Sequence, residues 1–376
     1  MRKFGKKNEI DLNPLSYNLL LCGQSGIGKT TISKEICEKL VGEDGYIHFN
    51  IGRESGTDAI NGIISEDIED WAKLDEVVTD IIENKTEDYP DLKVIVWDSL
   101  DELINIGEKE TIRQYNRTIS PGDKKAESIL SAYGGFGRGM DHNVDMILNT
   151  MWELKKVGVQ SFIISHTKRS DIIDPVSQAA YSQLTADTQQ RYFNAIKNKM
   201  DIVAMAYIDR EIISENTGRK NPVTKKDVMV NKVSNEVRVI VFRDDNFAVD
   251  SKSRFANIVD RISFDADEFI KAITDAIQAE QDKAGISTKD AKKRQAAKDK
   301  AEAEKAAKYS EEVRENKIDE DRNEEIKEQI QKHMTDLEKE KKDAFLEKMA
   351  ELGIKNFKNV DEIPTKKLEE LLTFFA

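Results

Sequence analysis

The chain has little cysteine and no long apolar run. Only two of its 376 residues are cysteines, Cys22 and Cys37, which excludes a disulfide framework and a cysteine-based zinc site and fits a reducing compartment. No apolar stretch approaches the roughly 20 residues that a membrane-spanning helix needs. The first residues are basic, but no apolar segment precedes Pro14, so they do not resemble a signal peptide. A cytoplasmic protein with no membrane partner is therefore expected.

The sequence also lacks an excess of basic residues. Its formal net charge is −13, and neither residues 1–264 nor residues 265–376 carry more basic than acidic side chains. This argues against non-specific coating of duplex DNA by the whole surface, because such binding depends on clustered positive charge. Any nucleic-acid site must be local or formed by assembly.

Up to about residue 264, short apolar runs alternate with longer amphipathic segments. This pattern is typical of an α/β fold with a mostly parallel sheet and helices on both faces. Strands are expected at 17–22, 46–51, 92–98, 159–165 and 201–208. Helices are expected at 29–41, 66–84, 99–117, 140–157 and 187–199. A hairpin is expected at 226–242, with its turn near Ser234-Asn235.

The composition changes near residue 265. No proline occurs between Pro222 and Pro364, and alanine, lysine and glutamate dominate, with opposite charges three or four positions apart. This predicts a long solvated helix, broken near Tyr309-Ser310. Four parts are expected: a basic N-terminal tail (1–15), an α/β core (16–264), a charged helical extension (265–343) and a small helical module (344–376).

The strongest motif lies in "NLLLCGQSGIGKTTISKE", residues 18–35. It matches G-x-x-x-x-G-K-[ST], with an apolar strand before it and a helix opening at Lys29. Glycines allow the backbone N–H groups to face phosphates, and the helix N-terminus favours anions. Lys29 is expected at the β- and γ-phosphates, Thr30 at Mg²⁺ and Thr31 at the α-phosphate. The residues expected to bind ATP are Gly23, Gln24, Ser25, Gly26, Ile27, Gly28, Lys29, Thr30 and Thr31.

A second acidic motif completes the expected Mg²⁺ site. "KVIVWDSLDEL", residues 93–103, delivers Asp98 to the carboxyl end of a strand, where an acid can hold the water shell of the metal. Ser99 could assist that shell or cap the following helix.

Hydrolysis also needs a group that orients or activates water. Glu54, in "FNIGRESG", is the first candidate, and Asp101 or Glu102 are the alternatives. "FIISHTKRSD" places His166 after another strand, at the edge where ligands collect in open α/β sheets. His166 is therefore expected to sense the γ-phosphate, with Lys168 and Arg169 extending a small positive patch.

Taken together, residues 15–262 resemble the RecA-like nucleotide-binding proteins of phages, and more narrowly the short RecA-type single-strand annealing proteins of phage recombination modules. The stretches that carry the resemblance are "GQSGIGKTT", "VIVWDSLDEL", "AYGGFGRGMDHNVDMILNTMWEL" and "SFIISHTK". The resemblance implies a RecA-like core that uses ATP and Mg²⁺, binds single-stranded DNA and promotes annealing. It also implies a homo-oligomeric ring or filament, in the host cytoplasm if the chain is phage-encoded.

The same resemblance suggests roles for further residues. The acid after the second strand polarises the attacking water, which supports Glu54, and the residue ending the sensor strand couples the γ-phosphate to DNA-contacting loops, which supports His166. Residues 169–198 would then face DNA. The residues of this segment that offer charge or stacking surfaces are Arg169, Arg191, Tyr181 and Tyr192. Those that could reach a phosphate, DNA or a neighbouring subunit are Arg138, Arg243, Lys252 and Arg254.

Several functions remain open at this point. The first is ATP-dependent single-strand binding and annealing, with a single-strand-binding protein or recombination partner on the C-terminal helices. The second is a hexameric RecA- or AAA-type helicase or loader, for which the sequence offers only weak candidates for an arginine finger. A small-metabolite kinase fits the "SHTK" strand poorly. The last is a non-catalytic switch that acts through its C-terminal helices.

Overall fold

The computed structural model describes residues 10–54, 56–120, 122–173, 178–220, 227–244, 248–335, 339–354, 356 and 363–375. Its centre is a nine-stranded sheet with the order β11-β9-β8-β1-β5-β4-β2-β3, in which β10 also pairs with β8. The strands of this sheet are β1 (Leu19–Gly23), β2 (Tyr46–Ile51), β3 (Ser65–Ile68), β4 (Val94–Asp98), β5 (Gln160–Ser165), β8 (Ile202–Lys220), β9 (Asp227–Val241), β10 (Lys252–Ser253) and β11 (Arg261–Ser263).

Six neighbouring strands of this sheet run parallel, in the spatial order β8, β1, β5, β4, β2 and β3. Their carboxyl ends therefore share one edge. Cys22 pairs with Ser165 across β1 and β5, and Asp98 pairs with Asn50 across β4 and β2. The segments that follow β1, β2, β4 and β5 therefore meet at this edge, as expected for an open α/β sheet. The predicted mixed α/β core with a mostly parallel sheet is confirmed.

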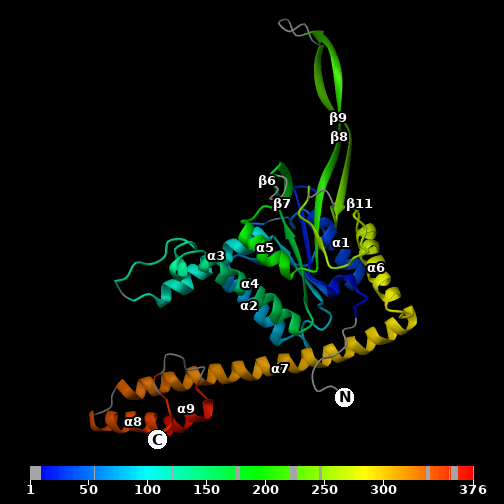
Figure 1. Ribbon diagram of the computed structural model, residues 1–376. Helices are drawn as coiled ribbons and strands as arrows, with labels where there is room; N and C mark the ends of the chain where they lie inside the picture. The colour runs from blue at the N-terminus through cyan, green and yellow to red at the C-terminus, as the bar shows by residue number, and fades with distance from the viewer. Residues whose placement is uncertain are drawn as a thin grey trace.

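Helices cover both faces of the sheet (Figure 1). One face packs against α1 (Lys29–Val41) and α6 (Ala266–Lys283). The other face packs against α2 (Trp71–Glu83), α3 (Leu100–Thr118), α4 (Arg138–Lys156) and α5 (Gln190–Lys199). Because the central strands are buried on both sides, they appear in the sequence as continuous apolar runs.

The predicted helix at 66–84 is wrong in its first part. Residues Ser65–Ile68 form β3 at the sheet edge, and α2 starts only after Asp70. The carboxylate of Asp70 accepts a hydrogen bond from the backbone N–H of Lys73, which is a standard N-cap. A short edge strand of four residues carries no periodicity that separates it from the first turns of a helix.

The predicted turn at Ser234-Asn235 is also wrong. Both residues lie inside β9, which pairs antiparallel with an extended β8; Asn235 is opposite Glu211 and Ile212 is opposite Val233. Ser234 is therefore the extra residue of a bulge, and its hydroxyl donates to the carbonyl of Glu211. The pair forms a long arm that projects from the core (Figure 1).

A second, two-stranded sheet lies beside the main one. It consists of β6 (Thr167–Ile173) and β7 (Ala180–Ala186), paired antiparallel directly after β5. Short turns of 3-10 helix in the described part of the core are η1 (Pro14–Ser16), η2 (Glu43–Gly45) and η3 (Ala132–Gly134).

The C-terminal part is helical, but no break occurs near Tyr309-Ser310. α7 (Thr288–Thr335) is continuous there and crosses beneath the core in Figure 1. Tyr309 packs partly against the core, and its hydroxyl hydrogen-bonds to Glu153 of α4. Good helix-forming residues on both sides keep the helix intact. The predicted core ends at residue 264, yet α6 packs beyond it, with Phe269 and Ile273 buried.

The chain ends in α8 (Lys339–Glu351), α9 (Thr365–Leu372) and the short turn η5 (Thr373–Phe375). These pack on the end of α7 around a separate apolar cluster that includes Ile326, Phe345 and Leu368. Among the described helices, none combines the length and apolar character that a bilayer crossing requires. Residues 1–9 of the predicted basic tail lie outside the described residues.

Candidate active site

The phosphate loop joins β1 to α1. Gly26 and Gly28 have φ values of 75° and 107°, a left-handed conformation that glycine adopts without strain. α1 begins at Lys29 with no side-chain cap, so its first N–H groups remain available to an anion. The Lys29 ammonium donates to the carbonyls of Gly23 (2.9 Å) and Gln24 (3.2 Å). Burial lowers the pKa of Lys29, while the nearby carboxylate of Asp98 opposes that shift.

Asp98 lies at the end of β4, directly beside the start of α1. Its Oδ2 accepts hydrogen bonds from the Thr30 hydroxyl at 2.7 Å and from His48 Nε2 at 3.2 Å. Burial would raise the pKa of Asp98, but the hydrogen bonds from His48 and Thr30 outweigh it and lower the pKa. The structure therefore brings together Thr30 and Asp98, the two residues predicted to bind magnesium, and their oxygen atoms are ligands that suit Mg²⁺. It also shows His48 as a second hydrogen-bond partner of Asp98.

Glu54 lies on the loop that follows β2, close to the same site. The hydroxyl of Ser99 donates to Glu54 Oε1 at 3.2 Å. Burial, and then repulsion by Asp98, raise the pKa of Glu54. Ser99 precedes α3 at the N-cap position, but its side chain makes no capping bond there. Its hydroxyl instead holds the carboxylate that the sequence predicts to act on water.

The loop carrying Glu54 is tied to the sheet and packed against the metal-binding pair. Asn50 Nδ2 donates to Thr57 Oγ1 at 2.7 Å and to Asp67 Oδ1 at 2.8 Å. A Cβ atom at Gly56 would lie 3.0 Å from the Thr30 hydroxyl oxygen. A larger side chain at position 56 would thus crowd the place where Thr30 meets Asp98.

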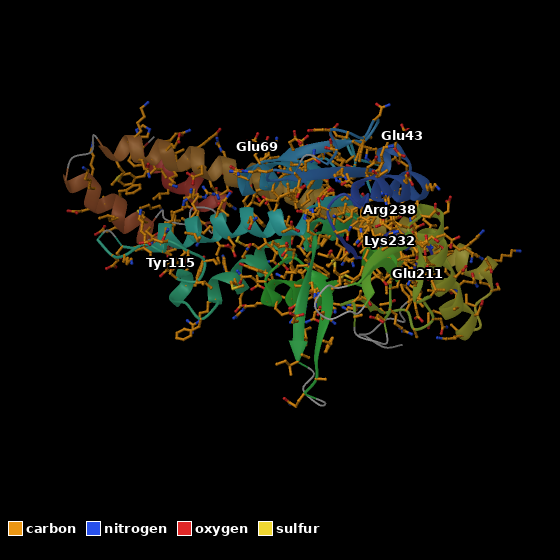
Figure 2. All side chains as sticks on the ribbon, turned by 90° about the horizontal axis from the view of Figure 1, so that it is seen from above. Glu43, Glu69, Tyr115, Glu211, Lys232 and Arg238 are labelled. Atoms are coloured by element: carbon orange, nitrogen blue, oxygen red, sulfur yellow. The ribbon has the colours of Figure 1, made fainter. Side chains whose placement is uncertain are left out.

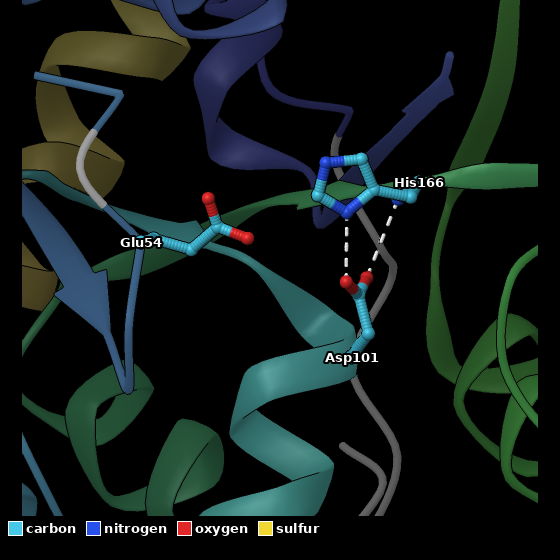
Figure 3. A group of neighbouring side chains, drawn as sticks. All are labelled: Glu54, Asp101 and His166. Carbon is cyan, nitrogen blue, oxygen red and sulfur yellow. Dashed lines mark hydrogen bonds and ion pairs between the residues drawn. The ribbon is translucent and has the colours of Figure 1, made fainter. Parts of the chain in front are cut away.

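His166 forms a close pair with Asp101, and both face Glu54 (Figure 3). His166 Nδ1 lies 2.7 Å from Asp101 Oδ2, and the backbone N–H of His166 donates to Asp101 Oδ1 at 3.3 Å. The hydrogen bond to Asp101 raises the pKa of His166. Burial would raise the pKa of Asp101, but its hydrogen bond with His166 outweighs burial and lowers it. One ligand atom from each of the three side chains lies within 4.8 Å of the others.

Two residues of this region were not predicted from the sequence. His48 lies in the run 46–51, whose composition predicts an apolar strand. The one available signal was that the polar residues His48 and Asn50 are two positions apart, so that both point to the same face of the strand. Arg238 of β9 is labelled in Figure 2, and its Nη1 donates to the carbonyl of Ile27 at 3.3 Å. No local motif distinguishes this arginine, because strand pairing brings it to the loop.

Lys168 and Arg169 lie on β6, two and three residues after His166, and both are exposed. Lys168 Nζ donates to the carbonyl of Thr188 at 2.8 Å, and Arg169 Nη2 donates to Ser182 Oγ at 2.6 Å. They remain on the carboxyl edge of the sheet, next to His166.

The other predicted contact residues lie on different elements. Arg191 of α5 pairs with Asp141 at 2.6 Å, near the start of α4, where Arg138 is the first residue. Tyr192 was expected to offer a stacking surface, but it is buried and its hydroxyl donates to Glu108 Oε1 at 2.7 Å, so that expectation is wrong. Tyr181 lies on β7 and is half-buried.

Arg243, Lys252 and Arg254 are all engaged within their own chain. Lys252 Nζ donates to three carbonyls at the end of α5, Arg254 pairs with Asp201 at 3.1 Å, and Arg243 donates to the carbonyl of Ala256 at 3.1 Å. Burial lowers the pKa of Lys252. Lys252 thus caps the carbonyl groups at the C-terminal end of α5, where the helix dipole favours a cation.

Comparison with known proteins places this site in a family. Among the solved structures that resemble the chain, two each share 12% sequence identity with it. A KaiC-like protein of the archaeon Pyrococcus horikoshii has a TM-score of 0.33, with 63% of this chain and 88% of that chain covered. An ATPase from the type III secretion system of pathogenic bacteria has a TM-score of 0.31, with 51% of each chain covered. Neither similarity is high enough to support an argument about activity.

No curated protein matches the sequence at a significant level. The family model described as an AAA domain, however, matches residues 16–255, which include the phosphate loop, Asp98 and His166. That match covers more than half of the chain. The chain therefore belongs to the AAA domain family and is a P-loop ATPase by family.

Proposed function

We propose that this chain binds ATP with Mg²⁺ at the phosphate loop and hydrolyses it. The observation that carries the proposal is the contact of Thr30 Oγ1 with Asp98 Oδ2 at 2.7 Å, beside the buried ammonium of Lys29. Thr30 and Asp98 would hold Mg²⁺, which neutralises phosphate charge when bound. Lys29 would contact the β- and γ-phosphates in place of the loop carbonyls to which it now donates.

Glu54 is the residue best placed to accept a proton from water. Its raised pKa suits a general base, because a base works best when its pKa approaches the working pH. Ser99 holds Oε1 and thereby orients the carboxylate. The two alternatives have other partners: Asp101 accepts from His166, and Glu102 Oε1 accepts from Asn105 at 3.2 Å.

His166 would contact the γ-phosphate through Nε2. Its Nδ1 is directed at Asp101 Oδ2, which fixes the ring and leaves the other nitrogen for a ligand. The raised pKa of His166 favours the cationic form, which attracts phosphate oxygens. In this role His166 would report whether the γ-phosphate is present.

We further propose that the nucleotide state controls binding of single-stranded DNA by the β6–β7 hairpin, and that the protein promotes annealing as a homo-oligomer. The hairpin begins at Thr167, immediately after His166, and carries the exposed cations Lys168 and Arg169. Positive charge that tracks the backbone is the usual basis of single-strand binding. The proposed role in phage recombination or replication rests on the sequence resemblance alone, and the proposed partner on the C-terminal helices rests on the apolar end "LEELLTFFA", residues 368–376.

The nucleotide site can be tested by equilibrium titration of the full chain with ATP, in the presence of Mg²⁺ and again in EDTA. Wild type should bind more tightly with Mg²⁺, Lys29→Ala should lose most of the affinity, and Asp98→Asn should lose most of the gain from Mg²⁺. Lys39→Ala is the matched control, because Lys39 is an exposed lysine on the same helix. Unchanged ATP binding by Lys29→Ala would contradict the proposed site.

A further inference from the structure

His48 is a fully buried histidine on the face of the sheet that α1 covers. It belongs to β2 and is 0% exposed. Side chains alternate along a strand, so His48 shares its face with Tyr46 and Asn50. Tyr46 and Val96 belong to the apolar cluster beneath α1, and Val96 is the register partner of His48 on β4. His48 is therefore a polar group inserted into the apolar layer under the phosphate loop.

The contacts of His48 determine which nitrogen carries the proton. Nε2 lies 3.2 Å from Asp98 Oδ2, whereas Nδ1 is buried and has no partner among the described residues. A proton on Nδ1 would be a buried donor without an acceptor, which is costly. The hydrogen bonding thus assigns a proton to Nε2, which donates to the carboxylate.

The same carboxylate oxygen receives a second hydrogen bond. The Thr30 hydroxyl donates to Oδ2 at 2.7 Å from the start of α1, whereas His48 donates from β2. Two donors on different elements restrict rotation of the carboxyl group, and Oδ1 takes neither of these bonds.

From this arrangement, we infer that His48 is a positioning residue for the metal-binding carboxylate of Asp98. His48 does not itself contact nucleotide; it fixes the orientation of the Asp98 carboxylate, which together with Thr30 would hold Mg²⁺. Partners behind a ligating carboxylate commonly tune metal affinity in this way. The inference rests on the proposed function and extends it to a residue of the apolar strand.

The test compares the gain in ATP affinity that Mg²⁺ produces in wild type and in variants, measured by titration with and without the metal. His48→Leu removes the donor and should reduce this gain by about tenfold, the lower end of the loss usual for residues behind a metal ligand. ATP affinity in EDTA should remain that of wild type. His48→Gln can place an N–H near the position of Nε2 and should recover much of the gain.

Two further variants separate positioning from folding. Tyr46→Phe changes a buried polar residue on the same face of the same strand and should behave as wild type. If His48→Leu does not fold, His48→Asn and His48→Gln give the comparison: both are polar, but the shorter Asn cannot reach Asp98, so only Gln should retain the gain.

The outcomes separate the role inferred for His48 from the proposed binding of ATP with Mg²⁺. A wild-type protein whose ATP affinity does not respond to Mg²⁺ would contradict the proposed function, and the inference with it. A wild-type response that His48→Leu, or His48→Asn, retains in full would overturn the inference and leave the proposed function standing.

Discussion

His166 Nδ1 lies 2.7 Å from Asp101 Oδ2, and the backbone N–H of His166 lies 3.3 Å from the other oxygen of the same carboxylate. One side chain at the start of α3 thus holds both the ring and the backbone of His166, the residue that follows β5. The β6–β7 hairpin begins one residue later, so any displacement of His166 acts directly on the root of that hairpin.

Replacement of Asp101 should uncouple His166 from its support. We expect Asp101→Asn to bind ATP as wild type does but to hydrolyse it roughly tenfold more slowly, because a misaligned acid–base or sensing group usually costs at least that factor. Single-turnover hydrolysis at saturating ATP measures the effect. Glu76→Gln, an exposed acid on α2, is the control. Wild-type turnover by Asp101→Asn would exclude a role for the pair.

The same pair should make stability depend on pH. The pKa of His166 is raised in the folded state, so its contribution to the free energy of unfolding is full below the unfolded value of about 6.5 and is lost as pH rises through the higher folded pKa. The stability difference between wild type and Asp101→Asn should therefore shrink from pH 6 toward higher pH. Urea unfolding at a series of pH values measures it, and a difference independent of pH would contradict this account.

Glu54→Gln should separate binding from chemistry. The variant keeps the size of the side chain and can still accept from Ser99, so ATP affinity should be unchanged. Loss of the base should slow hydrolysis by about 100-fold, the lower range of general-base effects. Phosphate release under saturating ATP gives the rate. If Glu54→Gln turns over like wild type, the base must be Asp101, Glu102 or a residue of a neighbouring subunit.

The β6–β7 hairpin can be tested by its charge. The double variant Lys168→Ala/Arg169→Ala should weaken single-stranded DNA binding and reduce the slope of log affinity against log salt by about 0.7 for each phosphate that the protein no longer neutralises. Fluorescence anisotropy with a labelled oligonucleotide at several salt concentrations measures both. Lys271→Ala/Lys283→Ala on α6 removes the same charge from exposed positions elsewhere. An equal reduction of affinity in the two double variants would point to net charge rather than to the hairpin.

Helix α7 is attached to the core by polar contacts as well as apolar ones, which gives a further prediction. Arg314 donates to the carbonyl of Glu83, to Asn84 Oδ1 and to Glu87 Oε1. Arg314→Ala should increase hydrogen exchange of the α7 amides near this contact, and high salt should have a similar effect on wild type. Lys308→Ala is the control, because Lys308 is exposed on the same helix. Exchange unaffected by Arg314→Ala would show that apolar contacts such as Tyr309 suffice.

Much of the core could be predicted from the sequence because the apolar patterns of its helices and strands, and the phosphate-loop motif, each lie within a short stretch of chain. The helix at 29–41 and the strand at 46–51 have the predicted bounds, and the phosphate loop is a contiguous motif. The extended β8–β9 arm could not be predicted from local composition. Its bulge at Ser234 is decided by the strand opposite, and a Ser-Asn pair is equally compatible with a turn.

The site itself could be predicted only in part. Asp98, Glu54 and His166 each end or follow an apolar strand, so parallel pairing brings them to one edge. The partners of these residues are set by packing across the sheet. His48 lies within a mostly apolar run and was not predicted, and Asp101 was predicted only as an alternative base. Arg238 contacts Ile27 although the two residues are 211 positions apart in the sequence.

The most direct test of the central claim is ATP hydrolysis by the purified full chain, followed as phosphate release with and without single-stranded oligonucleotide, beside Lys29→Ala. The account predicts Mg²⁺-dependent hydrolysis by wild type that single-stranded DNA increases, and loss of that hydrolysis in Lys29→Ala. Hydrolysis that Lys29→Ala retains, or no hydrolysis by wild type under either condition, would contradict it.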